Sequence, residues 1–204
     1  KRQDQGLTAY FVTTQNVTST IAGMVVGSCM AYTRRLKRYL LFGFIIRLLG
    51  VLLMVHYRSV GHSALALLTC QVLQGIGGGA LALTTQVAVQ VAVEPSKIAA
   101  VIAFELLTTD LGAALGSTLA SAVVQSVLPP ALASRLPELS APELEHIQGS
   151  LEAVLSHPPG TPMRTAITAA WVHVMKWLCA LSVVTQLPAL GLSFFIPDMN
   201  LHEP

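Results

Sequence analysis

Residues 39–57 read YLLFGFIIRLLGVLLMVHY, and Arg47 is the one aspartate, glutamate, lysine or arginine among them. A helix needs about 20 mostly apolar residues to cross the hydrocarbon core of a bilayer. This stretch has that length and character, so it predicts a membrane-spanning helix. Four further stretches share its pattern. The sequence therefore predicts an all-α polytopic membrane protein with five transmembrane helices, at residues 8–32, 39–57, 64–93, 98–128 and 166–196.

The composition of the whole chain agrees with this fold class. Of its 204 residues, 53% are hydrophobic and 11% are charged, and the mean hydropathy is +0.64. Soluble domains contain about a quarter charged residues, so one water-soluble core is excluded. The His and Cys residues have no metal-ligand spacing, and no nucleophile motif is present. We expect no enzyme activity, no cofactor, no metal site and no nucleic-acid partner.

Basic residues between the first two spans predict the orientation in the membrane. Lys and Arg collect in cytoplasmic loops, which places the basic loop in the cytoplasm. By alternation, residues 129–165 form an extracellular loop and residues 197–204 a cytoplasmic tail. The chain opens on KRQDQ rather than Met, from which we expect a piece of a longer protein. The basic loop consists of Arg34, Arg35, Lys37 and Arg38.

The long outer loop contains a helical pattern at residues 140–155, which read SAPELEHIQGSLEAVL. Apolar residues recur there at helical spacing, opposite glutamates. Ser140 and Glu143 are spaced as a capping box, in which each residue satisfies a free amide of the other. We expect a short amphipathic helix on the membrane surface or over the mouth of a transporter. The alternative is a disordered connector.

A glycine cluster superficially matches a dinucleotide-binding fingerprint. That fingerprint requires a preceding strand and an aqueous phosphate site, whereas this cluster lies inside an apolar span. Small residues in such a span let helix backbones approach closely, and two further glycines are spaced four apart. We therefore predict helix contacts at Gly75, Gly77, Gly78, Gly79, Gly112 and Gly116.

Polar side chains inside the spans are the candidate functional residues. A charge near the bilayer centre costs at least about 2.5 kcal/mol unless it meets a partner or water. Such residues therefore mark a transport path or a site of proton coupling. Alternatively, Arg47 and Lys176 reach an interface and the glutamines only join helices. The candidates are Asp110, Glu105, Arg47, Gln71, Gln74, His173 and Lys176.

The spacing of the two carboxylates divides their roles. Glu105 and Asp110 point about 140° apart on a helix, so one is expected to face a cavity and the other a neighbouring helix. A carboxylate kept from water binds a proton more readily, which is the physical basis of proton coupling. Arg47 is the expected counter-ion of either.

Several segments, in order along the chain, resemble the fungal siderophore-iron transporters of the major facilitator superfamily. They are RRLKR (34–38), VHYR (55–58), QVLQGIGGG (71–79), TQVAVQ (85–90), IAAVIAFELLTTDLGAALGST (98–118) and GTPMRTAITAAWVHVMKWLCALSVV (160–184).

The resemblance covers almost the whole chain and implies its function. Members have about fourteen spans, so this chain corresponds to the last five and lacks an N-terminal bundle. They import ferric siderophores with protons across the plasma membrane or a vesicle membrane. Asp110 matches a position that is acidic or amide in the family, whereas Glu105 and Arg47 depart from its aromatic or apolar residues.

Two other functions remain open. The first is a multidrug or small-solute:proton antiporter of the same superfamily, whose hallmark lies in a span that this chain does not contain. The second is a truncated membrane protein that does not transport, because five spans cannot enclose a substrate alone.

Overall fold

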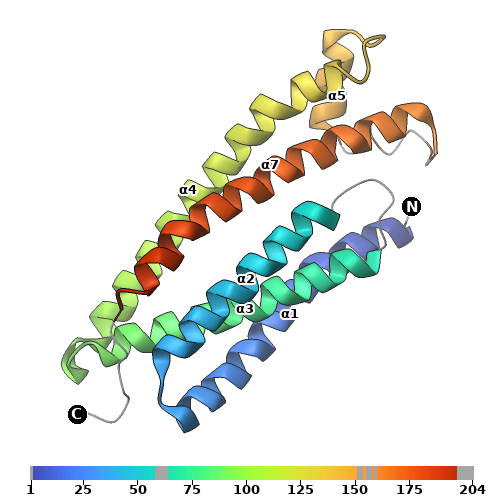
Figure 1. Ribbon diagram of the computed structural model, residues 1–204. Helices are drawn as coiled ribbons and strands as arrows, with labels where there is room; N and C mark the ends of the chain where they lie inside the picture. Colours follow the sequence, from blue (N-terminus) through green and yellow to red (C-terminus); the bar gives the residue numbers. More distant parts are fainter. Residues whose placement is uncertain (1, 58–63, 151–153, 155–157, 159, 197–204) are drawn as a thin grey trace.

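A computed structural model of the chain describes residues 2–57, 64–150, 154, 158 and 160–196. Long helices dominate it, and they run beside one another (Figure 1). The elements are α1 (Arg2–Thr33), α2 (Leu36–Tyr57), α3 (Ala64–Val91), the 3-10 turn η1 (Pro95–Lys97), α4 (Ile98–Ala133), α5 (Ala141–Gly149) and α7 (Pro162–Ser193).

Four helices in the described part are long and apolar enough to cross a membrane, at Leu36–Tyr57, Leu65–Val91, Pro95–Ala133 and Pro162–Ser193. The chain is therefore an all-α polytopic membrane protein, as its sequence predicts. The described part of α1 is not among the four. α1 contains the predicted span 8–32, and its crossing of the membrane stays a prediction.

The end of α4 differs from the sequence-based expectation. Proline lacks an amide hydrogen and crowds the preceding turn, and the predicted span 98–128 ends just before Pro129-Pro130. The helix instead continues through both prolines to Ala133. Leu128 and Leu132, on either side of the prolines, are buried. Their contacts hold the last turn in place despite its missing hydrogen bonds.

α3 packs against both α1 and α2, and glycines line both contacts. A Cβ atom built on Gly77 would lie 2.5 Å from the backbone nitrogen of Arg47 in α2. One on Gly75 would lie 2.8 Å from the carbonyl oxygen of Gln15 in α1, and one on Gly79 would collide with the carbonyl of Ser19. Only hydrogen atoms fit at these three positions, so the backbones of the three helices come unusually close.

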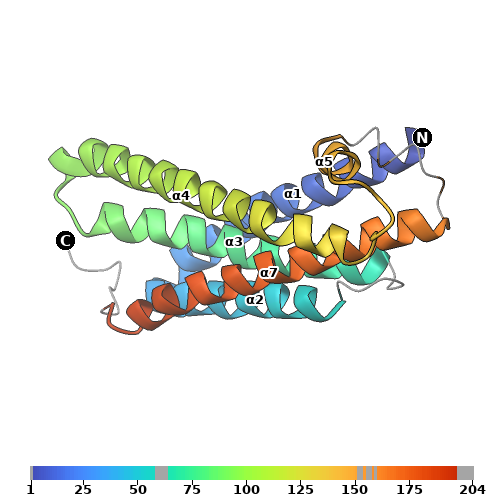
Figure 2. The ribbon, with the colours of Figure 1, turned by 90° about the horizontal axis from the view of Figure 1, so that it is seen from above.

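The other half of the molecule is built from α4, α5 and α7. α7 lies along α2 and along α4, and α5 covers the end where α4 and α7 meet (Figure 2). Seven buried residues form one hydrophobic cluster at that end, and Leu144 of α5 packs against it. The cluster consists of Leu128, Ala131, Leu132, Ile147, Ile167, Ala170 and Val174.

The predicted amphipathic helix is present over Ala141–Gly149 as α5. The backbone is extended at Ser150, and Val154 is again helical. Its buried Ile147 faces the cluster, while Glu143 and Glu145 are exposed. Leu151 and Leu155, which were part of the predicted apolar face, lie outside the described residues. The helix packs on α4 and α7 rather than lying free.

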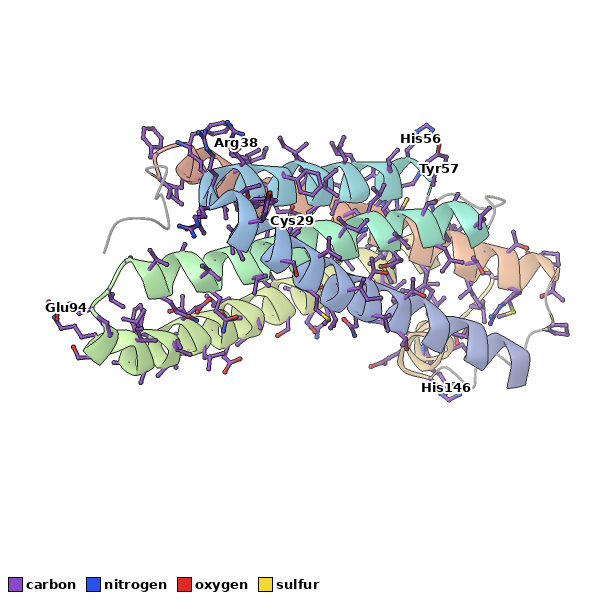
Figure 3. The ribbon with its side chains drawn as sticks, turned by 90° about the horizontal axis from the view of Figure 1, so that it is seen from below. Cys29, Arg38, His56, Tyr57, Glu94 and His146 are labelled. Atoms are coloured by element: carbon purple, nitrogen blue, oxygen red, sulfur yellow. The ribbon has the colours of Figure 1, made fainter. Side chains whose placement is uncertain are left out.

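The two ends of the bundle carry different loops. Arg38 and Glu94 lie toward one end, and Tyr57 and His146 toward the other (Figure 3). We call them the basic end, which contains residues 34–38, 94–97 and 193–196, and the loop end, which contains residue 57 and residues 134–150. Connections that alternate between two ends are those of an up-and-down helical bundle.

Candidate solute path

α4 exposes a polar face along its length. Asp110, Ala114, Ser117, Ser121 and Gln125 follow one another three or four residues apart, so they line one face of the helix, and all five are exposed. We call this set the α4 polar face. No residue in the most apolar stretch of α4 is buried within the described part. The face is therefore open along its whole length.

Most hydroxyl groups on α4 are satisfied within the helix itself. Thr109 donates to the Glu105 carbonyl oxygen at 2.9 Å, and Ser117 donates to the Ala114 carbonyl oxygen at 2.9 Å. Such bonds let Ser and Thr face lipid at little cost. A carboxylate has no such option, because it only accepts hydrogen bonds. Asp110 is thus the one residue of the α4 polar face whose charge demands water or a partner.

Glu105 and Asp110 are in different surroundings. Glu105 is half-buried and shares its side of α4 with Ile98, Ile102 and Val123, which are also half-buried. Asp110 is exposed on another side. Of the two carboxylates, only Asp110 is therefore on the α4 polar face.

Arg47 forms no ion pair with Glu105 or Asp110 among the described residues. The one ion pair in the described part of the chain joins Lys97 Nζ to Glu94, at 3.2 Å. Arg47 is exposed on α2, and its backbone forms the contact with Gly77. The Arg47 Cβ also lies in this contact, 2.6 Å from a Cβ built on Gly77. The pairing of Arg47 with Glu105 or Asp110 stays a prediction.

The two glutamines of α3 differ in their hydrogen bonding. Gln74 donates its amide to the Met54 sulfur at 3.2 Å, which joins α3 to α2. The side-chain oxygen of Gln71 is buried without a hydrogen-bond partner among the described residues. A buried unpaired amide oxygen costs about 1–3 kcal/mol, so Gln71 is a place where water or a further donor fits.

His173 and Lys176 lie on the exposed side of α7. Neighbouring Val174 is on another side of the helix and is buried in the hydrophobic cluster. The side chains of His173 and Lys176 are three residues apart on one face. The structure therefore brings them together on α7, and it places Asp110 on a different helix.

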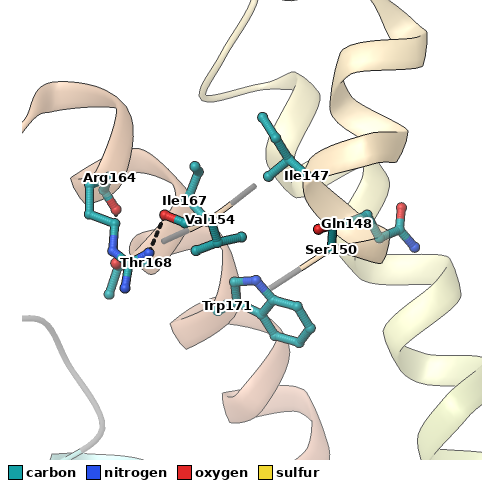
Figure 4. A pocket seen from close by; sticks show the side chains of 8 residues that line it. All are labelled: Ile147, Gln148, Ser150, Val154, Arg164, Ile167, Thr168 and Trp171. Atoms are coloured by element: carbon teal, nitrogen blue, oxygen red, sulfur yellow. Dashed lines mark hydrogen bonds between the residues drawn. The ribbon is translucent and has the colours of Figure 1, made fainter. Parts of the chain in front are cut away.

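A pocket of about 360 Å³ lies at the loop end, between α5 and α7 (Figure 4). Thr161 caps α7 by accepting a hydrogen bond from the Arg164 amide at 3.3 Å. The Arg164 guanidinium donates to the Val154 carbonyl oxygen and so ties the outer loop to α7. The lining residues are Ile147, Gln148, Ser150, Val154, Arg164, Ile167, Thr168 and Trp171.

Sequence reasoning missed Ser117, Ser121 and Gln125. Each is individually ordinary in a membrane helix, because small polar residues occur there as helix contacts. Their spacing from Asp110 could have identified them, because residues three or four apart lie on the same face of a helix.

The chain is similar to several known transporters. It is 36% identical to the siderophore iron transporter mirC of Emericella nidulans, over 91% of this chain and 31% of that protein. It is 34% identical to the MFS siderochrome iron transporter C of Aspergillus fumigatus, over 91% and 30% of the two chains. It is 30% identical to siderophore iron transporter 1 of Saccharomyces cerevisiae, over 91% and 30%.

The chain thus spans about a third of the length of these relatives. No family model matches it, and no solved structure does. The relatives are transporters, in agreement with the expectation that the chain is not an enzyme.

Proposed function

We infer that this chain, which is related over 91% of its length to fungal siderophore iron transporters, is part of a secondary transporter that carries ferric siderophores across a membrane. The observation that supports this most directly is Asp110, a carboxylate exposed on the middle of a membrane-spanning helix. Such residues in membrane proteins face a water-filled path or another helix bundle.

The α4 polar face is one wall of that path. Secondary transporters hold their solute between two helix bundles that rock about a site near the bilayer midplane. The described helices leave this wall open, and the relatives have about three times the length of this chain. The remaining two thirds of such a carrier closes the path from the other side.

We propose proton symport as the coupling mechanism. A carboxylate binds a proton when a closing cavity excludes water, and it releases the proton when the cavity opens. Asp110 is the candidate for this role because it is exposed on the path, whereas Glu105 is turned toward the half-buried side of α4.

Uptake of radioactive ferric siderophores tests the proposal. The host is a yeast strain without its own siderophore carriers. One culture expresses this chain alone, and a second expresses a chimaera in which the chain replaces the matching segment of the Emericella nidulans relative. We expect uptake by the chimaera that a protonophore abolishes, and none by the chain alone.

Each outcome has a separate meaning. A chimaera that reaches the membrane but takes up neither hydroxamate nor catecholate siderophores contradicts the siderophore function. Uptake that a protonophore leaves unchanged contradicts proton coupling but still supports siderophore transport. Protonophore-sensitive efflux of other solutes would establish the antiporter alternative instead.

A further inference from the structure

One hydrogen bond joins residues 34–38 to residues 193–196 at the basic end. Lys37 Nζ donates to the carbonyl oxygen of Phe194 at 2.8 Å. Phe194 is the C-cap of α7, where backbone carbonyls lack partners within the helix and carry partial negative charge. Lys37 is therefore occupied, and its bond places the end of α7 beside the loop between α1 and α2.

Arg34 and Arg35 lie between α1 and α2, Arg38 lies in the first turn of α2, and all three are exposed. The single ion pair of the described residues does not include them, because it joins Lys97 to Glu94. Three guanidinium groups within five residues repel one another unless an anion lies between them. The described part of the basic end supplies no carboxylate to them.

Arg34 also adopts an uncommon backbone conformation. Its φ of 56° lies in the left-handed region, and its amide donates to the Met30 carbonyl at 2.8 Å, which closes α1. Glycine takes this conformation without steric cost. An arginine stands here instead, at the sharp turn between α1 and α2 and at the same end of the molecule as Arg38.

Exposed aromatic rings lie at this end as well. Tyr32 is 91% exposed, Phe195 is 87% exposed and Phe194 is 58% exposed. Aromatic rings concentrate at the level of the lipid headgroups in membrane proteins. The rings therefore place the three guanidinium groups at the depth where lipid phosphates lie.

We propose that Arg34, Arg35 and Arg38 form a binding site for acidic glycerophospholipids in the leaflet at the basic end. A guanidinium binds a phosphate through two parallel hydrogen bonds, and the exposed rings contact the adjoining glycerol and acyl segments. The Lys37–Phe194 bond shapes this site by holding α7 against it. The site goes beyond solute transport and is independent of which solute is carried.

Native mass spectrometry of the purified chain tests the site. The chain in mild detergent is given equal amounts of phosphatidylserine and phosphatidylcholine, and the retained lipids are counted. Each basic residue near a membrane surface contributes about a fivefold preference for acidic lipid. We expect wild type to retain phosphatidylserine at least about tenfold better than phosphatidylcholine, and a variant with R34Q, R35Q and R38Q to retain both equally.

The matched control is Arg135→Gln at the loop end. Arg135 is also exposed, and its guanidinium donates to the Ala131 carbonyl at 3.0 Å. This variant should keep the full preference for phosphatidylserine. Replacing the three arginines with lysine should keep part of it, because the charge remains and the paired hydrogen bonds are lost.

Two results would overturn the site. The first is equal retention of the two lipids by wild type, which needs no variant. The second is an unchanged preference in the triple glutamine variant. Circular dichroism checks that this variant is folded. If the variant is not folded, the preference of wild type for phosphatidylserine is measured at increasing salt concentration instead. A preference based on charge must weaken with screening, so an unchanged preference would overturn the site.

Discussion

Asp110 is the single residue on which the transport proposal depends most. Its carboxylate is exposed on a membrane-spanning helix, without an ion pair in the described part of the chain. The neighbouring threonines return their hydroxyl hydrogen bonds to the helix backbone. The ionised aspartate cannot donate such a bond. A charge that faces lipid is costly, so its presence on α4 indicates that this position does not simply face lipid.

The first prediction concerns Asp110→Asn in the chimaera with the Emericella nidulans relative. Asparagine keeps the size and removes the proton-binding carboxylate. Protonophore-sensitive uptake should fall about tenfold or more, which corresponds to a lost interaction of about 1.4 kcal/mol. Uptake of radioactive ferric siderophore measures it.

Glu138→Gln is the control for that experiment. Glu138 is an exposed carboxylate in the connection between α4 and α5, outside the spans. Its replacement should leave uptake unchanged. Equal uptake by wild type and Asp110→Asn would show that Asp110 does not take part in proton coupling.

The second prediction concerns glycine contacts. A Cβ at Gly77 would lie 2.5 Å from the Arg47 nitrogen and 2.7 Å from its Cα, which are backbone atoms that cannot move aside. Gly77→Ala should therefore lower the stability of the chain in detergent by about 1–3 kcal/mol. A thermal ramp followed by size-exclusion chromatography measures the loss of folded protein.

Gly112→Ala is the matched substitution on α4. A Cβ at Gly112 would meet nothing within 4 Å, and alanine favours a helix over glycine by about 1 kcal/mol. The melting temperature should stay the same or rise slightly. Similar losses for both variants would show that the contact with Arg47 is not responsible.

At the scale of elements, α5 shows how a local signal fixes the start of a helix. The Glu143 carboxylate accepts hydrogen bonds from the Ser140 amide at 2.9 Å and from the Ser140 hydroxyl at 2.7 Å. These bonds hold the pKa of Glu143 below its usual value. The two hydrogen bonds therefore favour the ionised form of the Glu143 carboxyl group.

The third prediction follows from this pKa. Because the folded-state pKa of Glu143 is lowered, its stabilising effect is complete above the ordinary glutamate value of about 4.3. The effect disappears as the pH falls through the lower folded-state value. Hydrogen exchange at the α5 amides should therefore show protection at about pH 6 that decreases as the pH falls below the ordinary glutamate value, after correction for the intrinsic exchange rate.

Variants separate this cap from a general acid effect. Glu143→Gln should lower the protection at about pH 6 and flatten its pH dependence. Glu145→Gln, which replaces another exposed glutamate of α5, should retain the wild-type pH profile. The prediction fails if the profiles of the Glu143→Gln variant and of wild type coincide.

α4 represents the opposite case among the elements. It packs on α5 and α7 near its C-terminal end, and its most apolar stretch has no buried residue in the described part. Its helical state there comes from backbone hydrogen bonds, which lipid strengthens because no water competes for them. The bilayer and the rest of a carrier, rather than this bundle, determine what its side chains face.

At the scale of the whole molecule, alternation of the loops predicts a topology. Arg38 and Glu94 lie toward one end and Tyr57 and His146 toward the other (Figure 3). The positive-inside rule assigns the basic end to the cytoplasm. Each connection should therefore be accessible from one side of the membrane only.

The fourth prediction tests this topology with single cysteines. In a chain whose Cys29, Cys70 and Cys179 are replaced by alanine, Ser140→Cys should react with a membrane-impermeant maleimide added to intact cells. Ser96→Cys should react only after permeabilisation. Both serines are exposed at opposite ends. Labelling of both cysteines in intact cells would contradict the predicted orientation. Labelling of Ser96→Cys alone in intact cells would show that the orientation is the opposite one.

The sequence by itself determined the features that depend on local chemistry. Apolar length predicts the membrane helices, because the hydrocarbon core tolerates only segments that satisfy their own backbone. The spacing of Ser140 and Glu143 predicts the start of α5, because a cap involves residues within one turn. The ordered motifs also indicate the relationship to siderophore transporters that the comparisons then show.

Only the tertiary structure decided which helices meet. It placed Gly77 against the backbone and Cβ of Arg47, which no spacing within α2 reveals. It also joined Lys37 to Phe194 across 157 positions of the chain. The physical reason is that periodicity defines the faces of one helix, whereas the partner of each face depends on how all the helices fill space together.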